Sequence, residues 1–419
     1  MSVAVATAAP RSEARARIAG VAFLAVGLAM AWLFGAGSAG EGSASFGLNG
    51  PGQLADLPPL RLPASGTAYL LSVVCMFLGG IQLSRGFGTK LPLIGGVVAG
   101  LFVIAFLTWA ARGSSLNLYG MLQSTLLRSV PLTLGALSGV LCERSGVINI
   151  AIEGMMLTAA FAGAMVASAA GNLLIGTGAA AAAGALLGAA LAVLAIRYRV
   201  DQIVAGTVLN IFALGMTSYL TARILVSYPD LNSPGTFSPI AVPLLSKIPL
   251  VGPLLFRNNV FVFLTFVLIA IVWVGLFRTR WGLRVRAVGE HPHAAETVGV
   301  NVLRVRYRNV ILGGAVAGLA GAYLTLGAVG RFDENMTAGK GFIALAAMIF
   351  GRWNPIGAFG AALVFGFADS LQNKLAILNV PIPSEFLAMA PYLATILVVA
   401  GVVGRARPPA ADGQPYSKE

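Results

Sequence analysis

Long apolar runs separated by short polar segments constrain this chain more than any other feature. Of its 419 residues, 57% are apolar and 10% are charged, whereas a soluble domain carries about 25% charged residues. A run of about 20 apolar residues can span a bilayer as a helix. The sequence therefore predicts an all-α polytopic membrane protein with about 10–12 transmembrane helices and two broken or re-entrant segments. The candidate runs are residues 18–34, 66–83, 91–110, 121–141, 147–169, 173–196, 202–220, 260–277, 310–329, 342–350, 356–371 and 386–403.

Basic residues at the ends of these runs predict the orientation of the chain. Lys and Arg gather in the cytoplasmic loops of membrane proteins, and here they fall at alternate connections. The long loops 35–65 and 221–259 are poor in basic residues and belong outside. Both termini are therefore expected in the cytoplasm. The inside positions are Arg85, Lys90, Arg197, Arg199, the loop 278–308, Arg405 and Arg407.

The N-terminus and the net charge allow other interpretations. Arg11, Arg15 and Arg17 precede the run 18–34, and Gly-Ala-Gly-Ser-Ala-Gly follows it, which resembles a signal peptide with a cleavage site. We favour an uncleaved first span, because the run is long for a signal peptide and the rest of the chain is membrane-embedded too. The net charge of +13 does not indicate nucleic-acid binding, since the basic residues follow membrane topology.

The arginine-rich loop 278–308 contains the pattern of a short helix. Glu290 is placed to cap it, Pro292 suits its first turn, and Gly299 stands where a helix ends. Ala294 and Ala295 fill it. A folded cytoplasmic helix between two spans suggests that another protein docks there. His291 and His293 are expected to be surface contacts rather than a pH switch.

Two breaks interrupt the apolar runs. Arg128 and Pro131 are expected to interrupt the run 121–141, and residues 143–146 break the chain after it. The run 342–350 is too short to cross a bilayer and ends at residues 352–355. Paired broken segments in corresponding halves, here residues 118–220 and 309–403, indicate a transport site near the middle of a membrane.

Polar and aromatic residues beside the breaks are the candidate pathway residues. Asn149 and Glu153 are four apart, so a helix would place them on one face. Glu153 either contacts solute or has a structural role, capping the following helix or pairing with Arg144 or Arg128. Phe342, Trp353 and Asn354 flank the second break, where aromatic faces can stack on a planar ligand. For Trp353, which stands next to an arginine, a role as a membrane-interface anchor is the favoured interpretation.

Glycine pairs predict how the helices pack, and the sequence lacks the motifs of an enzyme. Gly184 and Gly188, like Gly314 and Gly318, are spaced four apart, which predicts close helix packing within the chain rather than a dimer seam. No catalytic or metal-binding motif occurs, and the two cysteines imply no disulfide framework. Residues 338–341 lack the loop of a phosphate-binding motif. We therefore expect no enzyme activity, no metal and no cofactor, and no ATP hydrolysis by this chain.

Three stretches resemble the permease subunits of bacterial ATP-binding-cassette (ABC) importers of the branched-chain amino acid, simple-sugar and nucleoside family, particularly the nucleoside type. Together they lie within residues 118–403. The first runs from Pro131-Leu-Thr-Leu-Gly-Ala-Leu137 through Glu143-Arg-Ser-Gly-Val-Ile-Asn-Ile-Ala-Ile-Glu-Gly-Met-Met156. The second is Gly282-Leu-Arg-Val-Arg-Ala-Val-Gly-Glu-His-Pro-His-Ala-Ala295 with Gly299. The third is Ala338-Gly-Lys-Gly-Phe-Ile-Ala-Leu-Ala-Ala-Met-Ile-Phe-Gly-Arg-Trp-Asn-Pro355.

The resemblance implies a nucleoside or simple-sugar importer in the bacterial cell (inner) membrane. It implies a separate ATPase subunit, a second and non-identical permease, and a substrate-binding lipoprotein outside. The residues expected to couple to the ATPase are Arg284, Arg286, Gly289, Glu290, Pro292, Ala294, Ala295 and Gly299. The resemblance divides the chain into an N-terminal extension (1–115), the permease domain (116–405) and a disordered cytoplasmic tail (406–419). An ion- or proton-coupled carrier is the alternative, although few ionisable residues lie deep in the runs. A membrane enzyme fits less well, since it would need a converging nucleophile, base or metal ligands, and a scaffold would not need the two broken segments.

Overall fold

The computed structural model describes residues 10–38, 42–377, 389 and 407–417. Within these ranges, nine helical segments are long and apolar enough to cross a membrane. Every predicted run up to residue 371 contains a helix, so the predicted all-α multi-span fold is confirmed. The run 386–403 lies outside the described residues. The nine segments are Ala16–Ser38, Ala64–Ser84, Gly88–Ala110, Leu118–Glu143, Ile152–Ala170, Leu173–Arg197, Gln202–Leu225, Val260–Arg278 and Val302–Val329.

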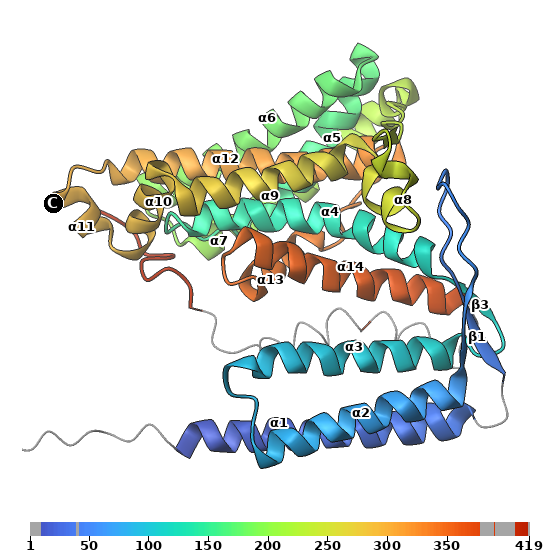
Figure 1. The fold of residues 1–419 in the computed structure, drawn as a ribbon. Coiled ribbons are helices and arrows are strands. Elements are labelled where there is room, and N and C mark those ends of the chain that lie inside the picture. The colour runs from blue at the N-terminus through green and yellow to red at the C-terminus, as the bar shows by residue number, and fades with distance from the viewer. Residues whose placement is uncertain (1–9, 39–41, 378–388, 390–406, 418–419) are drawn as a thin grey trace, which may run out of the picture. The chain divides into compact units, whose positions relative to one another are not determined.

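The chain divides into two compact units, Met1–Met121 with Gln372–Ser384 and Leu122–Leu371 with Glu385–Glu419. The first unit contains α1 (Pro10–Ala29), α2 (Ala64–Ser84) and α3 (Leu91–Ala110) (Figure 1). α1 continues through a π-helical turn, Met30–Gly35. Gly79 of α2 permits its close contact with α1, because a Cβ there would lie 2.9 Å from Leu24 Cγ.

A small sheet completes the first unit. It consists of β1 (Ser43–Gly47), β2 (Leu60–Pro63) and β3 (Ser115–Asn117) in the order β2-β1-β3. β1 is antiparallel to β2 and parallel to β3. The strands come from the loop 35–65 and from the residues just before the fourth span. From the sequence, residues 35–65 were expected only to form a long outside loop, with no strands.

The second unit is a bundle of long helices with shorter elements at its ends (Figure 1). π-helical turns extend α6, α7 and α12 through residues Val193–Arg197, Thr221–Leu225 and Tyr323–Val329. The elements in chain order are α4 (Leu118–Glu143), α5 (Ile152–Ala170), α6 (Leu173–Ala192), α7 (Gln202–Leu220), β4 (Ile240–Ala241), α8 (Val251–Phe256), β5 (Arg257–Asn258), α9 (Val260–Arg278), α10 (Arg280–Glu290), α11 (Pro292–Thr297), α12 (Val302–Ala322), α13 (Lys340–Phe350) and α14 (Pro355–Ile377).

The helix α4 continues through Pro131, contrary to the expected interruption. Proline leaves the carbonyl four residues earlier without its helical donor, and in lipid such a group must find another partner. The Tyr323 hydroxyl donates a hydrogen bond to this carbonyl, Leu127 O, at 2.8 Å. Arg128 forms an ion pair with Asp369 of α14. Contacts from distant parts of the chain therefore keep α4 unbroken.

Small residues bring α6 and α12 into backbone contact. A Cβ on Gly184 would lie 2.3 Å from Gly314 O, and a Cβ on Gly318 would lie 2.4 Å from Ala180 O. The predicted role of these glycines in packing within the chain is confirmed, since the two helices meet in one molecule. A β-carbon added at either glycine would force the backbones of α6 and α12 apart.

The end of the chain is folded where it is described. Residues 407–417, here called the tail segment, run beside α10 and α11 at one end of the second unit (Figure 1). Ala411 N donates to Gly289 O at 2.9 Å, and Tyr416 is 4% exposed. The expected disordered tail is therefore wrong for residues 407–417. Specific contacts with residues distant in the sequence hold the segment in place.

Candidate functional site

The two predicted breaks meet in the structure. Trp353 Nε1 donates to Glu143 Oε2 at 2.5 Å. Arg144 Nε donates to Trp353 O at 3.0 Å, and its Nη2 donates to Arg352 O at 3.2 Å. Arg352 and Trp353 have φ of +55° and +51°, a region that residues other than glycine rarely adopt. The hydrogen bonds from Arg144 hold this strained turn against the first break.

Side chains of α7 satisfy the backbone of the first break. Gln202 Oε1 accepts from Ile148 N at 2.7 Å. Asn210 Nδ2 donates to Ile150 O at 2.9 Å, and its Oδ1 accepts from Gly154 N at 2.8 Å. These partners allow an extended segment to replace a helical turn within a membrane protein. Sequence reasoning missed both residues, although an Asn inside the apolar run 202–220 was a signal.

Glu153 caps the half-length helix α13. Its Oε1 accepts from Gly339 N at 2.8 Å, and its Oε2 accepts from Gly341 N at 2.6 Å. A carboxylate satisfies the free N–H groups and the positive dipole of a helix N-terminus. The expected structural partners were its own helix, Arg144 or Arg128, so the choice of partner was wrong. Gly341 is required for this contact, because a Cβ there would lie 2.5 Å from Glu153 N.

The length of α13 shows how much of a membrane this helix can span. Its 11 residues rise about 16 Å as an α-helix, which is about half of a hydrocarbon core of about 30 Å. The second break follows its C-terminal end directly, and Glu153 holds its N-terminus. The N-terminus of a half-helix inside a bundle is the type of position where transporters bind polar solute groups.

The other predicted pathway residues lie in different environments. Asn149 precedes α5, so the helix-face argument that paired it with Glu153 was wrong. It is fully buried, and its Nδ2 donates to Ser138 Oγ at 3.3 Å. Trp353 is 5% exposed, whereas Phe342 is 49% exposed. Asn354 Oδ1 accepts from Ile356 N at 3.0 Å and so caps α14.

The arginine-rich loop contains two helices, α10 and α11. Pro292 is the first residue of α11 as predicted, and Gly299 with φ +83° follows its end. The predicted cap is wrong: Glu290 is the last residue of α10, and His291 occupies the N-cap without a side-chain hydrogen bond. Instead, Glu290 Oε2 accepts from Ala410 N at 3.1 Å.

The predicted docking residues divide into exposed and packed groups. Arg284, Glu290, Ala294 and Gly299 are exposed, while Gly289 and Ala295 are buried. Arg286 lies over the Phe277 ring at 5.3 Å, and Pro292 is half-buried. Gly289 permits direct contact with the first break, since a Cβ there would lie 2.3 Å from Arg144 O. The loop therefore has an exposed side and another side that is packed against the first break.

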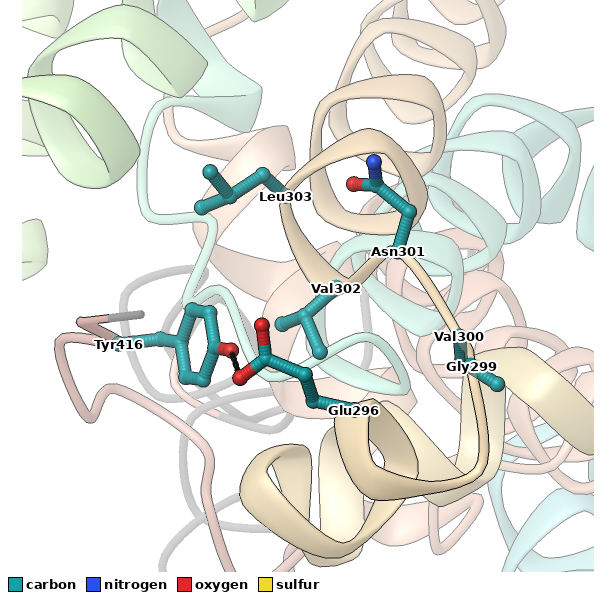
Figure 2. Close-up of a pocket in the computed structure, with 7 residues that line it drawn as sticks. All are labelled: Glu296, Gly299, Val300, Asn301, Val302, Leu303 and Tyr416. Atoms are coloured by element: carbon teal, nitrogen blue, oxygen red, sulfur yellow. Dashed lines mark hydrogen bonds between the residues drawn. The ribbon is translucent and has the colours of Figure 1, made fainter. Parts of the chain in front are cut away.

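A hollow of about 360 Å³ lies beside the end of α11 (Figure 2). Figure 2 shows the Tyr416 hydroxyl pointing to the Glu296 carboxylate, to which it donates a hydrogen bond. Within the described part of the chain, no cluster of three His, Cys, Asp or Glu residues is arranged as a metal site. The hollow is lined by Glu296, Gly299, Val300, Asn301, Val302, Leu303 and Tyr416.

Known proteins match most of the length of this chain. The guanosine ABC transporter permease protein NupQ of Bacillus subtilis is 41% identical over 312 residues, which are 71% of this chain and 96% of NupQ. The nucleoside ABC transporter permease protein NupC of Lactococcus lactis is 39% identical over 315 residues, with the same coverage of 71% and 96%. The putative glucose ABC transporter permease protein TsgC13 of Haloferax volcanii is 33% identical over 327 residues, covering 72% and 98%.

No solved structure matches the chain. The family model for the permease component of branched-chain amino acid transport systems matches residues 121–403. This range begins where the second compact unit begins and includes both breaks and the loop with α10 and α11. The chain belongs to the family of branched-chain amino acid transport system permease components.

Proposed function

We propose that the chain is the membrane-spanning permease subunit of an ABC importer in a bacterial cell (inner) membrane. Nucleosides are the proposed solute, with simple sugars second, since NupQ and NupC are 41% and 39% identical to this chain and TsgC13 is 33% identical. The observation that carries this proposal is a similarity that covers 96% of both nucleoside relatives.

The proposed energy source is a separate ATPase subunit that docks on α11. The helix exposes His293, Ala294 and Thr297, and Val298 beside it is 78% exposed. Its opposite side is fixed by the buried Ala295. A rigid surface helix can move as a body when its partner changes shape. ATP binding must then favour one conformation of the permease over the other.

The proposed solute path passes the N-terminus of α13. Half-helix ends and unwound backbone form the binding sites of many transporters, and here α13 and the first break supply both. A second, non-identical permease is proposed to complete the path, with a lipoprotein delivering the solute from outside. Cytoplasmic termini complete this proposed arrangement.

Reconstitution in liposomes tests the proposal. The chain would be combined with its ATPase, the second permease and the lipoprotein, and uptake of labelled guanosine and glucose would be measured. ATP-dependent guanosine uptake is expected, and an ATPase variant unable to hydrolyse ATP should abolish it. Uptake by this chain alone, driven by an ion gradient, would instead establish the secondary carrier.

A further inference from the structure

The tail segment attaches first to the end of α10. Ala411 N donates to Gly289 O at 2.9 Å, and Ala410 N donates to Glu290 Oε2 at 3.1 Å. Pro409 lies beside the same glycine, with its Cβ 3.4 Å from where a Gly289 Cβ would stand. These backbone contacts fix the start of the tail segment next to α11.

Tyr416 attaches the tail segment to α11 itself. Its ring packs in a small buried cluster with Val288, Ala295 and Val302, which come from α10, α11 and α12. Its hydroxyl donates to the Glu296 carboxylate (Figure 2), and a hydrogen bond to a charged acceptor is stronger than a neutral one. Without Tyr416, the three apolar side chains would lose a wall of their cluster.

A buried arginine ties the tail segment to α12. Arg306 is 2% exposed, and its Nη1 donates to Gln414 O at 2.9 Å. Its guanidinium carbon lies 5.9 Å from the Tyr416 ring centroid, which is a cation–π distance. A buried charge must have partners, and the tail segment supplies Gln414 O and the Tyr416 ring, while Nε and Nη2 of Arg306 have no hydrogen-bond partner among the described residues.

The other side of the tail segment contacts the first break. A Cβ on Gly413, with φ +74°, would lie 2.7 Å from Ile148 Cδ1. A Cβ on Gly146 would lie 3.1 Å from Ala411 O. The side chain of Asp412 interacts with that of Glu143, the residue that accepts from Trp353 of the second break. The segment therefore lies between α11 and the first break, and Glu143 of the first break in turn contacts the second break through Trp353.

We propose that the tail segment is a strut that transmits the movement of α11 to the two breaks. The inference rests on the proposed docking of an ATPase on α11. A segment held on one side by Glu296 and Arg306 and on the other by Ile148 and Glu143 cannot follow α11 without displacing the breaks. Interior packing transmits such shifts because it has little free space.

Two variants test the two ends of the strut one at a time. Tyr416→Phe removes the hydrogen bond to Glu296 and keeps the ring, while Gly413→Val introduces a side chain that collides with Ile148 and strains a positive φ. Ser417→Ala is the matched control, because Ser417 is exposed. The readout is solute taken up per ATP hydrolysed by the complete reconstituted importer. We expect both variants to lower this ratio about tenfold, within the usual range of couplings between sites, and the control to match the parent.

A double variant and a binding assay complete the test. If Tyr416 acts through Glu296, the double variant Tyr416→Phe with Glu296→Ala should lower the uptake per ATP no more than either change alone. Glu296→Gln, which keeps an acceptor oxygen, should retain most of the parent's uptake per ATP. An unchanged ratio in both strut variants would overturn the inference, as would loss of ATPase co-purification, which would make the segment a mere assembly contact. A parent assembly without ATP-dependent uptake would instead contradict the proposed function, and the strut with it.

Discussion

Polar residues beside the breaks act mainly on backbone groups. Gln202 and Asn210 pair with backbone groups of residues 148, 150 and 154, and Arg144 pairs with the strained turn at Arg352 and Trp353. Each of these groups would otherwise be an unsatisfied dipole inside a membrane protein. The sequence identified Glu153 as important but not its partner, because the α13 N-terminus is distant in sequence.

Replacement of Glu153 separates its two possible roles. Glu153→Ala leaves Gly339 N and Gly341 N without acceptors and should lower the free energy of unfolding by about 1.5–3 kcal/mol. Glu153→Gln keeps one acceptor oxygen and should lose less. Unfolding by SDS in mixed micelles measures both. If the Gln variant kept its stability and assembly but lost uptake, a direct contact with solute would be established.

The tail segment should respond to pH through Asp412. Burial raises the pKa of Asp412 to about 7, against the charge of Arg306 and the hydrogen bond with Glu143, which lower it. The docked segment therefore binds a proton that the free segment, with an ordinary aspartate pKa, releases above about pH 4. The contribution of Asp412 to docking is then complete below about pH 4 and is lost as pH rises to about 7.

Spin labels at positions 297 and 417 measure this docking directly. The fraction at short distance should fall between about pH 5 and about pH 8. Asp412→Asn should remove the pH dependence, because its amide resembles the neutral carboxyl. If the short-distance fraction still depended on pH in the Asn variant, the titrating group would be another residue.

At the scale of elements, hydropathy located the helices but not all their ends. α12 begins at Val302, before the predicted run 310–329, because its first turns carry Arg304 and Arg308, which a hydropathy pattern excludes. α5 begins at Ile152 rather than residue 147, because α7 stabilises the extended segment before it. Helix spacing did predict close packing at the glycine faces of α6 and α12, since small residues four apart mark a face by themselves, but it did not predict that these two faces meet.

This contact allows a matched pair of glycine substitutions on α6. Gly184→Ala places a Cβ 2.3 Å from Gly314 O, a backbone atom that cannot rotate away. It should destabilise the protein by about 1–3 kcal/mol. Gly178→Ala has no atom within 4 Å of its Cβ and should leave stability nearly unchanged. Equal unfolding midpoints for the two variants would show that α6 and α12 separate easily.

At the scale of the whole molecule, two loops of the second unit should face opposite sides of a membrane. α9 joins the loop that holds α8 to the loop that holds α10 and α11, and it is a single apolar helix of 19 residues. Such a helix spans a bilayer once. The arginine-rich end should face the cytoplasm, which is also the side where the proposed ATPase and strut must act.

Cysteine labelling tests this orientation. Gly235→Cys and Val298→Cys place thiols on the two exposed loops, and the native Cys75 and Cys142 are buried, which keeps background labelling low. A membrane-impermeant reagent added to intact cells should label position 235 at once and position 298 only after permeabilisation. Labelling of both positions in intact cells would place α11 outside. A helix on that side has no ATP to couple to, so the docking surface and the strut would both lose their physical basis.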